Sequence, residues 1–352
     1  MTRAPDIAVT GTAQLLAWQR RVLPPVEEVR PGLWSIPVPI PASPLRYTLS
    51  YAFVTDAGVV LVDPGWDTAE GRAAVTVGLA SAGAVLRDIA GVVVTHIHPD
   101  HHGLSAWLQE VAGAWVAMHP AEAMTLPARI YSAAHPPDDY GWLAANGVPA
   151  DEIEGLLVDP GRMADLLRMA EPDRFLEDGD RVPIPGREVR AVWTPGHTPG
   201  HLCLHDAAAG VLLTGDHLLP RITPNIGVFR GTAEADPLAA YLDSLDKVTG
   251  FRDDEALPAH EYRFRNVVGR VTSLITHHHD RAAEVLAIVG RRQTPTAWEV
   301  TAELTWSRGW EALHGMLRRM ALGEAVAHLN YLRGRRSLTS EGTNPIRWRT
   351  TA

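Results

Sequence analysis

The sequence predicts an α/β fold followed by a smaller, largely helical part. Two observations lead to this prediction. Up to about residue 260, short apolar runs rich in β-branched residues, such as residues 91–95, alternate with helix-like segments, such as residues 69–82. Beyond residue 260, helix-like segments follow one another. Several of the strand-like runs lead directly into histidine or aspartate, which places candidate ligands at strand ends.

The first part is expected to begin with an N-terminal extension over residues 1–25 and to continue as a large domain over residues 26–265. The extension contains a short predicted helix around residues 15–22, which Pro24 and Pro25 end because proline cannot continue a helix. Strand-like sequence follows. The next predicted elements are a helix at 69–82, a strand at 91–98 and a helix that begins over 104–111.

Residues 119–171 interrupt this alternation as an insertion. They are helix-prone and are punctuated by Pro136, Pro137 and Pro149. The insertion also contains the aromatic residues Tyr131, Tyr140 and Trp142. Because a long insertion is usually functional, we expect a helical lid that helps to form the substrate pocket. A surface through which the chain forms a homodimer is the alternative.

The second part is a small helical domain expected over residues 266–335. Its predicted helices lie at 262–289, 294–304 and 309–332. The first of them carries the consecutive histidines His277, His278 and His279. Three adjacent residues spread around a helix and cannot all face one ion, so we expect a solvated or partly packed turn. The arginine-rich residues 336–352 are expected to form a disordered basic tail.

Four candidate metal ligands lie within six positions, directly after the apolar run at residues 91–95: His96, His98, Asp100 and His101. In an extended chain alternate side chains share a face, so His96 and His98 are expected to bind one cation together. The turn that follows brings Asp100 and His101 to a second, neighbouring position. A histidine-rich loop held only by hydrogen bonds is the alternative, but this strand-and-turn pattern favours two adjacent metals.

Three later segments each place donors just past a strand-like run. The donors are His197 and His201, Asp216 and His217, and finally His260. Taken singly, each segment is more typical of a turn histidine or a capping aspartate. Taken together with the first segment, they provide enough ligands to surround two cations.

At this point the chain resembles the metallo-β-lactamase superfamily. The signature H-x-H-x-D-H, a later His, a later Asp and a final His occur in this order between about Val26 and Arg265. The resemblance implies a four-layer αβ/βα sandwich with the metal site at one edge of its two sheets. It also implies that one zinc ion is held by His96, His98 and His197, a second by Asp100, His101 and His260, and that Asp216 bridges them.

The resemblance further implies a hydrolase. Two close cations lower the pKa of a shared water towards neutrality and polarise the carbonyl or phosphoryl oxygen of a substrate. We assign catalytic roles to Asp100 and to His201, which could protonate the leaving group; an orienting role for His201 is equally consistent. Asp63, His102 and His217 are expected to support the ligands. Zinc is expected, and manganese and iron are alternatives, because imidazole–carboxylate sites discriminate weakly among these metals.

The composition fits an enzyme of this kind. With 352 residues, 46% hydrophobic and 21% charged, the chain can bury a large core. The single cysteine, Cys203, excludes an internal disulfide and agrees with a cytoplasmic location. Neither a signal peptide nor a membrane-spanning run is evident. The net charge of −9 argues against a generally nucleic-acid-binding surface.

The favoured function is hydrolysis of a small-molecule thioester, lactone or other ester, as in glyoxalase II-like branches of the superfamily. The alternative is a metal-dependent single-strand endoribonuclease, because the C-terminal helices and residues 324–329 resemble the small winged-helix domain of a branch that includes such enzymes. A bridging Asp216 disfavours a true β-lactamase, and Ala259, where glycine usually precedes the last histidine, leaves the substrate open. Arg221 is a candidate to anchor a substrate charge, with a surface salt bridge as the alternative.

Overall fold

The computed structural model describes residues 6–127, 129, 138–157, 168–228 and 236–351. The chain divides into two compact units. Unit 1 comprises residues 1–130, 164–224 and 244–273, and unit 2 comprises residues 131–163, 225–243 and 274–352. Each unit therefore combines stretches that are far apart in sequence, whereas the sequence predicted successive domains.

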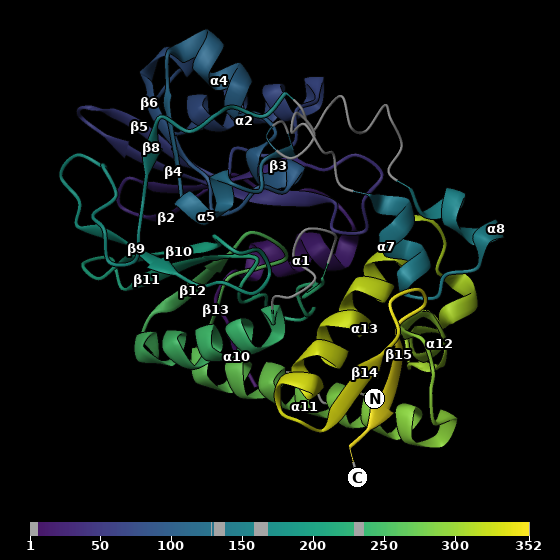
Figure 1. Ribbon diagram of the computed structural model, residues 1–352. Coiled ribbons are helices and arrows are strands. Elements are labelled where there is room, and N and C mark those ends of the chain that lie inside the picture. Colours follow the sequence, from purple (N-terminus) through teal and green to yellow (C-terminus); the bar gives the residue numbers. More distant parts are fainter. Residues whose placement is uncertain (1–5, 128, 130–137, 158–167, 229–235, 352) are drawn as a thin grey trace. The chain divides into compact units, whose positions relative to one another are not determined.

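Unit 1 is built on two sheets (Figure 1), in the strand orders β2-β3-β4-β5-β6-β7-β8 and β1-β13-β12-β11-β10-β9. The strands of the seven-stranded sheet are β2 (Glu27–Arg30), β3 (Leu33–Pro39), β4 (Tyr47–Thr55), β5 (Gly58–Val62), β6 (Ile89–Val93), β7 (Trp115–Met118) and β8 (Arg174–Phe175). Those of the six-stranded sheet are β1 (Ala8–Val9), β9 (Val189–Trp193), β10 (Leu202–Asp206), β11 (Val211–Gly215), β12 (Glu255–Pro258) and β13 (Phe264–Arg265). Because β5 and β6 are parallel, as are β11 and β12, the loops after these strands leave at shared edges.

The helices that accompany these sheets are α1 (Thr12–Arg20), α2 (Ala69–Ser81), α3 (Pro99–His102), α4 (Ser105–Ala112) and α5 (Pro120–Ala123), with 3-10 turns η1 (Leu86–Asp88) and η3 (Thr249–Phe251). Two further helices, α10 (Pro237–Val248) and α11 (Val267–Arg292), contribute residues 244–248 and 267–273 to this unit. Helix α2 starts where the Thr68 hydroxyl accepts a hydrogen bond from the Gly71 amide, a typical N-cap.

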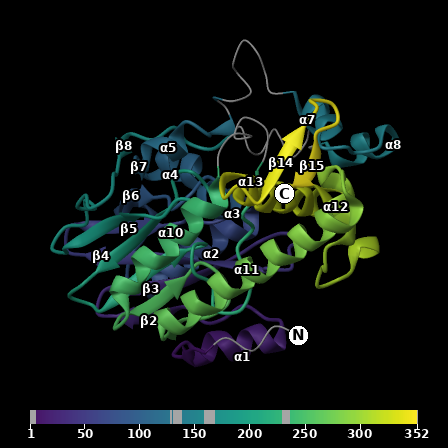
Figure 2. The same ribbon diagram turned by 60° about the horizontal axis from the view of Figure 1, so that its bottom comes forward.

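The core of unit 1 has two apolar layers. Between the sheets, Phe53 and Val60 of one sheet are buried against Leu204 and Leu213 of the other. Behind the seven-stranded sheet, α2 and α4 bury side chains against its outer face. That second layer includes Ile36, Val92, Val75, Leu79 and Leu108. The α10 and α11 residues of this unit lie on the side of the six-stranded sheet that faces away from the seven-stranded sheet (Figure 1; turned view in Figure 2), so the predicted four-layer αβ/βα sandwich is confirmed.

The expected N-terminal extension is partly integrated into the sandwich. Strand β1 pairs with β13 at the edge of the six-stranded sheet. From α1, the buried Gln14 amide donates to Ser35 Oγ at 3.2 Å, and its carbonyl accepts from the Arg263 amide at 3.0 Å. These contacts join the N-terminal residues to both sheets. Strand β1 has only two residues, which is too short for a sequence pattern to reveal. It forms because it pairs with the distant strand β13.

Unit 2 contains the predicted C-terminal helices and part of the insertion. Its elements are α7 (Asp139–Ala145), α8 (Ala150–Ile153), η2 (Glu154–Leu156), the remainder of α10 and α11, α12 (Ala297–Glu303), η4 (Trp310–Ala312), α13 (Met316–Gly334), β14 (Leu338–Glu341) and β15 (Arg347–Thr350). Helix α11 starts later than predicted because residues 264–265 are used in β13. Helix α12 starts at Ala297, where Thr296 and Glu299 form a capping box. The winged-helix resemblance stays a prediction.

The expected disordered tail is wrong. Strands β14 and β15 form an antiparallel hairpin, and Trp348 within it is only 2% exposed. The Trp348 amide donates to the Pro295 carbonyl at 2.9 Å, ahead of α12. The arginines suggested a solvated end, but the apolar side chains of Trp348 and Leu338, which lie among these charged residues in sequence, are buried.

The insertion at 119–171 contributes to both units. Helix α5 belongs to unit 1, whereas α7, α8 and η2 belong to unit 2. Tyr131, Pro136 and Pro137 lie outside the described residues. The described part packs on α13 through the buried Arg319, which donates to Asp139 at 2.7 Å and to the Leu156 carbonyl at 3.1 Å. The lid and the homodimer surface remain predictions.

The three consecutive histidines of α11 form a partly packed turn, as predicted. His278 is buried and its Nδ1 lies 3.3 Å from Nε2 of His328 on α13. His328 Nδ1 in turn donates to the Glu324 carbonyl at 2.8 Å. Burial lowers the pKa of His328 to about 4, and burial together with the neighbouring His328 lowers the pKa of His278 well below its ordinary value.

This pair predicts a pH-dependent stability. An unfolded histidine titrates near pH 6.5. Between about pH 6.5 and 4 the unfolded chain therefore binds protons that the folded pair excludes, and the free energy of unfolding decreases as the pH is lowered. His328 alone contributes on the order of 3 kcal/mol across this window. We expect a His278→Gln/His328→Gln variant to lose stability less steeply than the wild-type chain in urea unfolding at several pH values. His279→Gln, at an exposed position, is the control and should keep the wild-type slope. An unchanged slope in the double variant would contradict the prediction.

Candidate active site

The first ligand segment leaves the seven-stranded sheet earlier than predicted. Strand β6 ends at Val93, so His96 and His98 lie in a loop and not on a strand. The loop is held close to the sheet because the Val94 amide donates to the Ala117 carbonyl of β7 at 2.9 Å. His98 is the N-cap residue of α3, a helix with proline at its first position. The short helix then turns Asp100 and His101 towards the same region.

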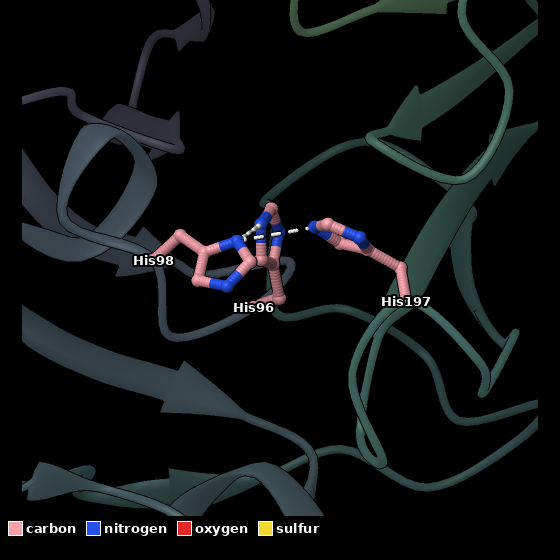
Figure 3. A group of neighbouring side chains, drawn as sticks. All are labelled: His96, His98 and His197. Atoms are coloured by element: carbon pink, nitrogen blue, oxygen red, sulfur yellow. Dashed lines mark hydrogen bonds between the residues drawn. The ribbon is translucent and has the colours of Figure 1, made fainter. Parts of the chain in front are cut away.

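Three histidines from two distant loops meet in the first cluster (Figure 3). His98 Nδ1 lies 2.9 Å from His96 Nε2 and 3.1 Å from His197 Nε2. His197 comes from the loop between β9 and β10, almost a hundred residues further along the chain. All three rings point their nitrogens to one point, which is the arrangement needed to bind a single cation.

A second cluster adjoins the first. It consists of Asp100, His101 and His260. His260 Nε2 lies 3.4 Å from Asp100 Oδ2, and His101 Nε2 lies 3.8 Å from the same oxygen. His260 follows β12 and Asp216 follows β11, so the parallel pairing of these strands brings them to the same edge.

Asp216 lies between the two clusters. Its Oδ1 is 3.1 Å from His260 Nε2 and 3.6 Å from His101 Nε2, whereas its Oδ2 is 3.7 Å from His197 Nε2. One carboxylate oxygen therefore faces each cluster. The structure brings together all seven residues predicted as ligands. Their roles as metal ligands are a proposal.

The rings are oriented by hydrogen bonds at their other nitrogens. His96 Nδ1 contacts Thr95 Oγ1 at 3.0 Å, and His260 Nδ1 contacts the Tyr47 carbonyl at 2.9 Å. His101 Nδ1 contacts Asp63 Oδ2 at 2.8 Å. Such contacts are typical of metal-binding histidines, because they select the tautomer and direct the free nitrogen.

Asp63 supports the ligand loop as the sequence predicted. Besides His101, it accepts hydrogen bonds from the Thr95 amide at 2.8 Å and the Thr95 hydroxyl at 2.7 Å. Its backbone has a φ of 53°, a conformation that non-glycine residues seldom adopt. The turn after β5 thus holds this carboxylate under the ligand loop.

Charge and burial oppose each other in the site. Burial would lower the pKa of His101, but Asp216 and Asp63 hold it well above its ordinary value. Burial would likewise raise the pKa of Asp216, but His260 and His101 hold it well below its usual range. By contrast, burial and the neighbouring imidazole of His197 lower the pKa of His98 to about 3. Burial and the neighbouring His101 likewise lower the pKa of His96, so His96 and His98 present neutral imidazoles, the form that binds metal.

The donors fit a pair of divalent cations. His101 Nε2, His260 Nε2 and Asp216 Oδ1 are buried without a hydrogen-bond partner among the described residues, although they lie close together. Orphaned buried polar atoms are costly, so their convergence indicates a ligand. Imidazole nitrogens and carboxylate oxygens are the donors that zinc and similar transition metals prefer.

His201 does not have the position of a general acid. It is fully buried, its Nδ1 contacts Thr194 Oγ1 at 2.8 Å and its Nε2 accepts from the Asp216 amide at 3.2 Å. Both ring nitrogens are therefore engaged, and the catalytic assignment of His201 is corrected to support of the Asp216 loop. His102 has a similar place, with Nε2 on the Ala170 carbonyl at 3.0 Å. His217 is also buried.

Arg221 forms the ion pair that the sequence left as the alternative. Its guanidinium contacts Glu261 at 2.8 Å and lies over the Trp18 ring, with its carbon 5.4 Å from the ring centre. Glu261 is fully buried and follows the ligand His260. The arginine thus neutralises a buried carboxylate beside the site.

One buried carboxylate at the site was missed by the sequence analysis. Glu122, on α5, accepts hydrogen bonds from the Ile97 amide at 2.8 Å and the Gly200 amide at 2.7 Å. Burial raises the pKa of this carboxyl to about 7. The only sequence signal was a glutamate in the first turn of a short helix after a strand, which is usually an exposed position.

Comparison with known proteins identifies the family. The metallo-beta-lactamase superfamily pattern matches residues 43–260, which is more than half of the chain. The chain belongs to this superfamily, as the resemblance predicted. The superfamily binds divalent metals through clusters of histidine and aspartate, and the clusters described above supply candidate ligands of this kind.

Two solved structures are similar over nearly the whole chain. A metallo-beta-lactamase family protein from Thermus thermophilus has 30% identity and a TM-score of 0.77, and the match covers 92% of this chain and 100% of that one. A beta-lactamase domain protein from Burkholderia ambifaria has 29% identity and a TM-score of 0.74, with 98% and 97% covered. The similarity therefore extends beyond the sandwich to the C-terminal region.

Curated relatives match over a shorter region. The lactamase-like protein vrtG of Penicillium aethiopicum is 32% identical over 118 residues, 33% of this chain and 36% of the relative. An atrochrysone carboxyl ACP thioesterase of Paecilomyces divaricatus is 28% identical over 154 residues, 42% of this chain and 46% of the relative. The chain thus spans about a third to just under half of the length of these relatives.

The geometry predicts two ions per chain. We expect protein purified without chelator, and supplied with zinc, to carry two metal equivalents by elemental analysis, and His98→Ala to lose one of them. His205→Ala is a matched control, because this histidine contacts Asp254 away from the clusters, and it should keep both. A wild-type stoichiometry that stays at or below one would contradict a dinuclear site.

Proposed function

We propose that the protein is a dinuclear metal-dependent hydrolase of a small-molecule thioester, lactone or other ester. The observation that carries this proposal is the convergence of seven nitrogen and oxygen donors from four separate loops, with Asp216 between two clusters. The named thioesterase among the relatives supports the choice of an acyl substrate. A pair of zinc ions fits these donors best, with manganese or iron as alternatives.

In this proposal His96, His98 and His197 hold one ion, Asp100, His101 and His260 hold the other, and Asp216 contacts both. When bound, such a metal pair lowers the pKa of a shared water and polarises an acyl carbonyl. The remaining chemistry falls to the protein. Asp63, Thr95 and Tyr47 keep the rings oriented through the contacts described above, so that binding requires little rearrangement.

Asp100 is the proposed proton carrier. Its side chain is 13% exposed, whereas those of His101 and His260 are fully buried. A carboxylate at the open side of the site can take a proton from the attacking water and deliver it to the leaving group. With His201 committed to the Asp216 amide, Asp100 is the remaining predicted catalytic residue that is open to substrate.

A single-strand endoribonuclease is the second candidate, since phosphoryl and acyl hydrolysis can use the same donors. The net charge of −9 disfavours it. The arginine-rich C-terminal residues, which were the strongest basic cluster in the sequence, pair in part with acidic neighbours; Arg349 contacts Glu341 at 2.9 Å. Small-molecule substrates are therefore proposed, and no nucleic-acid partner.

None of the helices within the described residues combines the length and apolar character needed to traverse a bilayer.

The position of Asp216 predicts the effect of its replacement. Asp216→Asn keeps the shape of the side chain but removes the negative charge between the clusters. We expect turnover of a thioester substrate to fall by at least ~10²-fold, with the circular dichroism spectrum and the thermal unfolding of the metal-free protein retained. Asp56→Asn, at an exposed turn, is the matched control and should retain full activity. Near-wild-type turnover in Asp216→Asn would place this residue outside the reaction.

Salt distinguishes the two candidate activities. A ribonuclease contacts several phosphates, so its binding weakens steeply with salt, whereas a small acyl substrate makes at most one or two ionic contacts. We expect zinc-loaded protein to hydrolyse an acyl thioester or lactone at rates that change little between low and physiological salt, and to leave a short single-stranded RNA intact. RNA cleavage that is suppressed by moderate salt and abolished in His98→Ala would favour the ribonuclease instead.

A further inference from the structure

Glu122 connects the two loops that carry the first histidine cluster. One oxygen of its carboxylate accepts from the Ile97 amide at 2.8 Å, between His96 and His98 in sequence. The other accepts from the Gly200 amide at 2.7 Å, three residues after His197. The side chain is fully buried, and these loops are about a hundred residues apart in the chain. A single carboxylate therefore links the loop of His96 and His98 to the loop of His197.

We propose that Glu122 is a positioning residue that holds His197 against His96 and His98, so that the first metal site is formed before the ion arrives. This inference rests on the proposed function, because it concerns the affinity of the site for its metal. A carboxylate suits the role. It offers two acceptor oxygens to two amides, whereas a glutamine would turn its NH₂ group towards one of them and leave that amide unsatisfied.

The His197 loop packs directly on α5. A Cβ atom built on Gly200 would lie 2.3 Å from the Glu122 backbone nitrogen, so only glycine allows this approach. The short distance explains how the Glu122 side chain can reach the Gly200 amide while its own helix stays in place. Any side chain at position 200 would push the loop away from α5, and with it His197.

The same helix contacts the loop at a second place. His119, the N-cap residue of α5, stacks on Trp193 with ring centres 5.0 Å apart and planes 4° from parallel. The Trp193 indole donates to the Pro199 carbonyl at 3.0 Å. Helix α5 and its cap thus hold the loop at both Pro199 and Gly200.

The alternative is that Glu122 only stabilises the fold. The two roles predict different results. A purely structural residue would lower the unfolding temperature of the metal-free protein and leave both metal affinities in the same ratio. A positioning residue lowers the affinity for the ion held by His96, His98 and His197, and spares the ion held by His101 and His260.

The test is a titration of the metal-free full chain with Co²⁺ or Zn²⁺ against a competing chelator. We expect Glu122→Gln to weaken one of the two metal-binding steps by about 10- to 100-fold, and the other by less than about 3-fold. The Co²⁺ absorption spectrum of the weakened site should change as its geometry loosens. With saturating metal, kcat should fall more than KM changes, because the loss affects the reacting centre. Glu171→Gln, at an exposed ion pair with Arg129, is the matched control and should behave like the wild-type protein.

Two further variants keep the test decisive if Glu122→Gln does not fold. Gly200→Ala retains the carboxylate but displaces the loop, and should weaken the same metal-binding step. Trp193→Phe keeps the stacking ring but removes the bond to Pro199, and should weaken that step by a smaller factor. Equal affinities of the variants and the wild-type protein, or an equal loss at both sites, would overturn the inference. Failure of the wild-type protein itself to bind two ions would instead overturn the proposed function.

Discussion

The contact between Asp63 and the segment Thr95–His101 is the interaction on which the site depends. Asp63 follows β5 and Thr95 follows β6, and these strands are parallel neighbours. Three hydrogen bonds from one carboxylate therefore hold the start of the ligand loop and the ring of His101 at once. Further along the loop, the Ile97 amide donates to Glu122 and the Asp100 carbonyl accepts from the Thr48 hydroxyl. The loop that leaves the seven-stranded sheet thus carries four of the seven candidate donors, and Asp63, which lies outside both clusters, supports it.

The other three candidate donors come from loops of the six-stranded sheet. The parallel pair β11 and β12 presents Asp216 and His260, and the β9–β10 loop presents His197. Burying these groups together carries a desolvation cost, which the attraction between Asp216 and the imidazoles of His101 and His260 opposes. Three buried donor atoms remain without hydrogen bonds among the described residues. Cations at this position would satisfy these atoms, so the buried donors themselves favour metal binding.

Support around the ligands is divided among groups that have no part in the chemistry. His201 holds the Asp216 amide, Tyr47 orients His260, and Glu122 joins two loops. These contacts are buried and each uses a specific atom pair. The result is a site whose geometry is set by the sandwich, with Asp100 on its accessible side. The division explains why histidines next to the ligands in sequence have quite different roles from the ligands themselves.

The sequence alone identified the candidate ligands and the class of fold. The spacing of His96, His98, Asp100 and His101 is a local property, and the order of the later donors after apolar runs is visible without coordinates. The tertiary structure decided what depends on distant partners. It pairs β1 with β13, and it buries Trp348 of the basic tail, whose amide donates to the Pro295 carbonyl. It also buries His201 and occupies both of its ring nitrogens with hydrogen bonds. Glu122 shows the limit most clearly. Its neighbours in sequence predict an exposed glutamate, and only the packing of two loops on α5 makes it a buried acceptor for both.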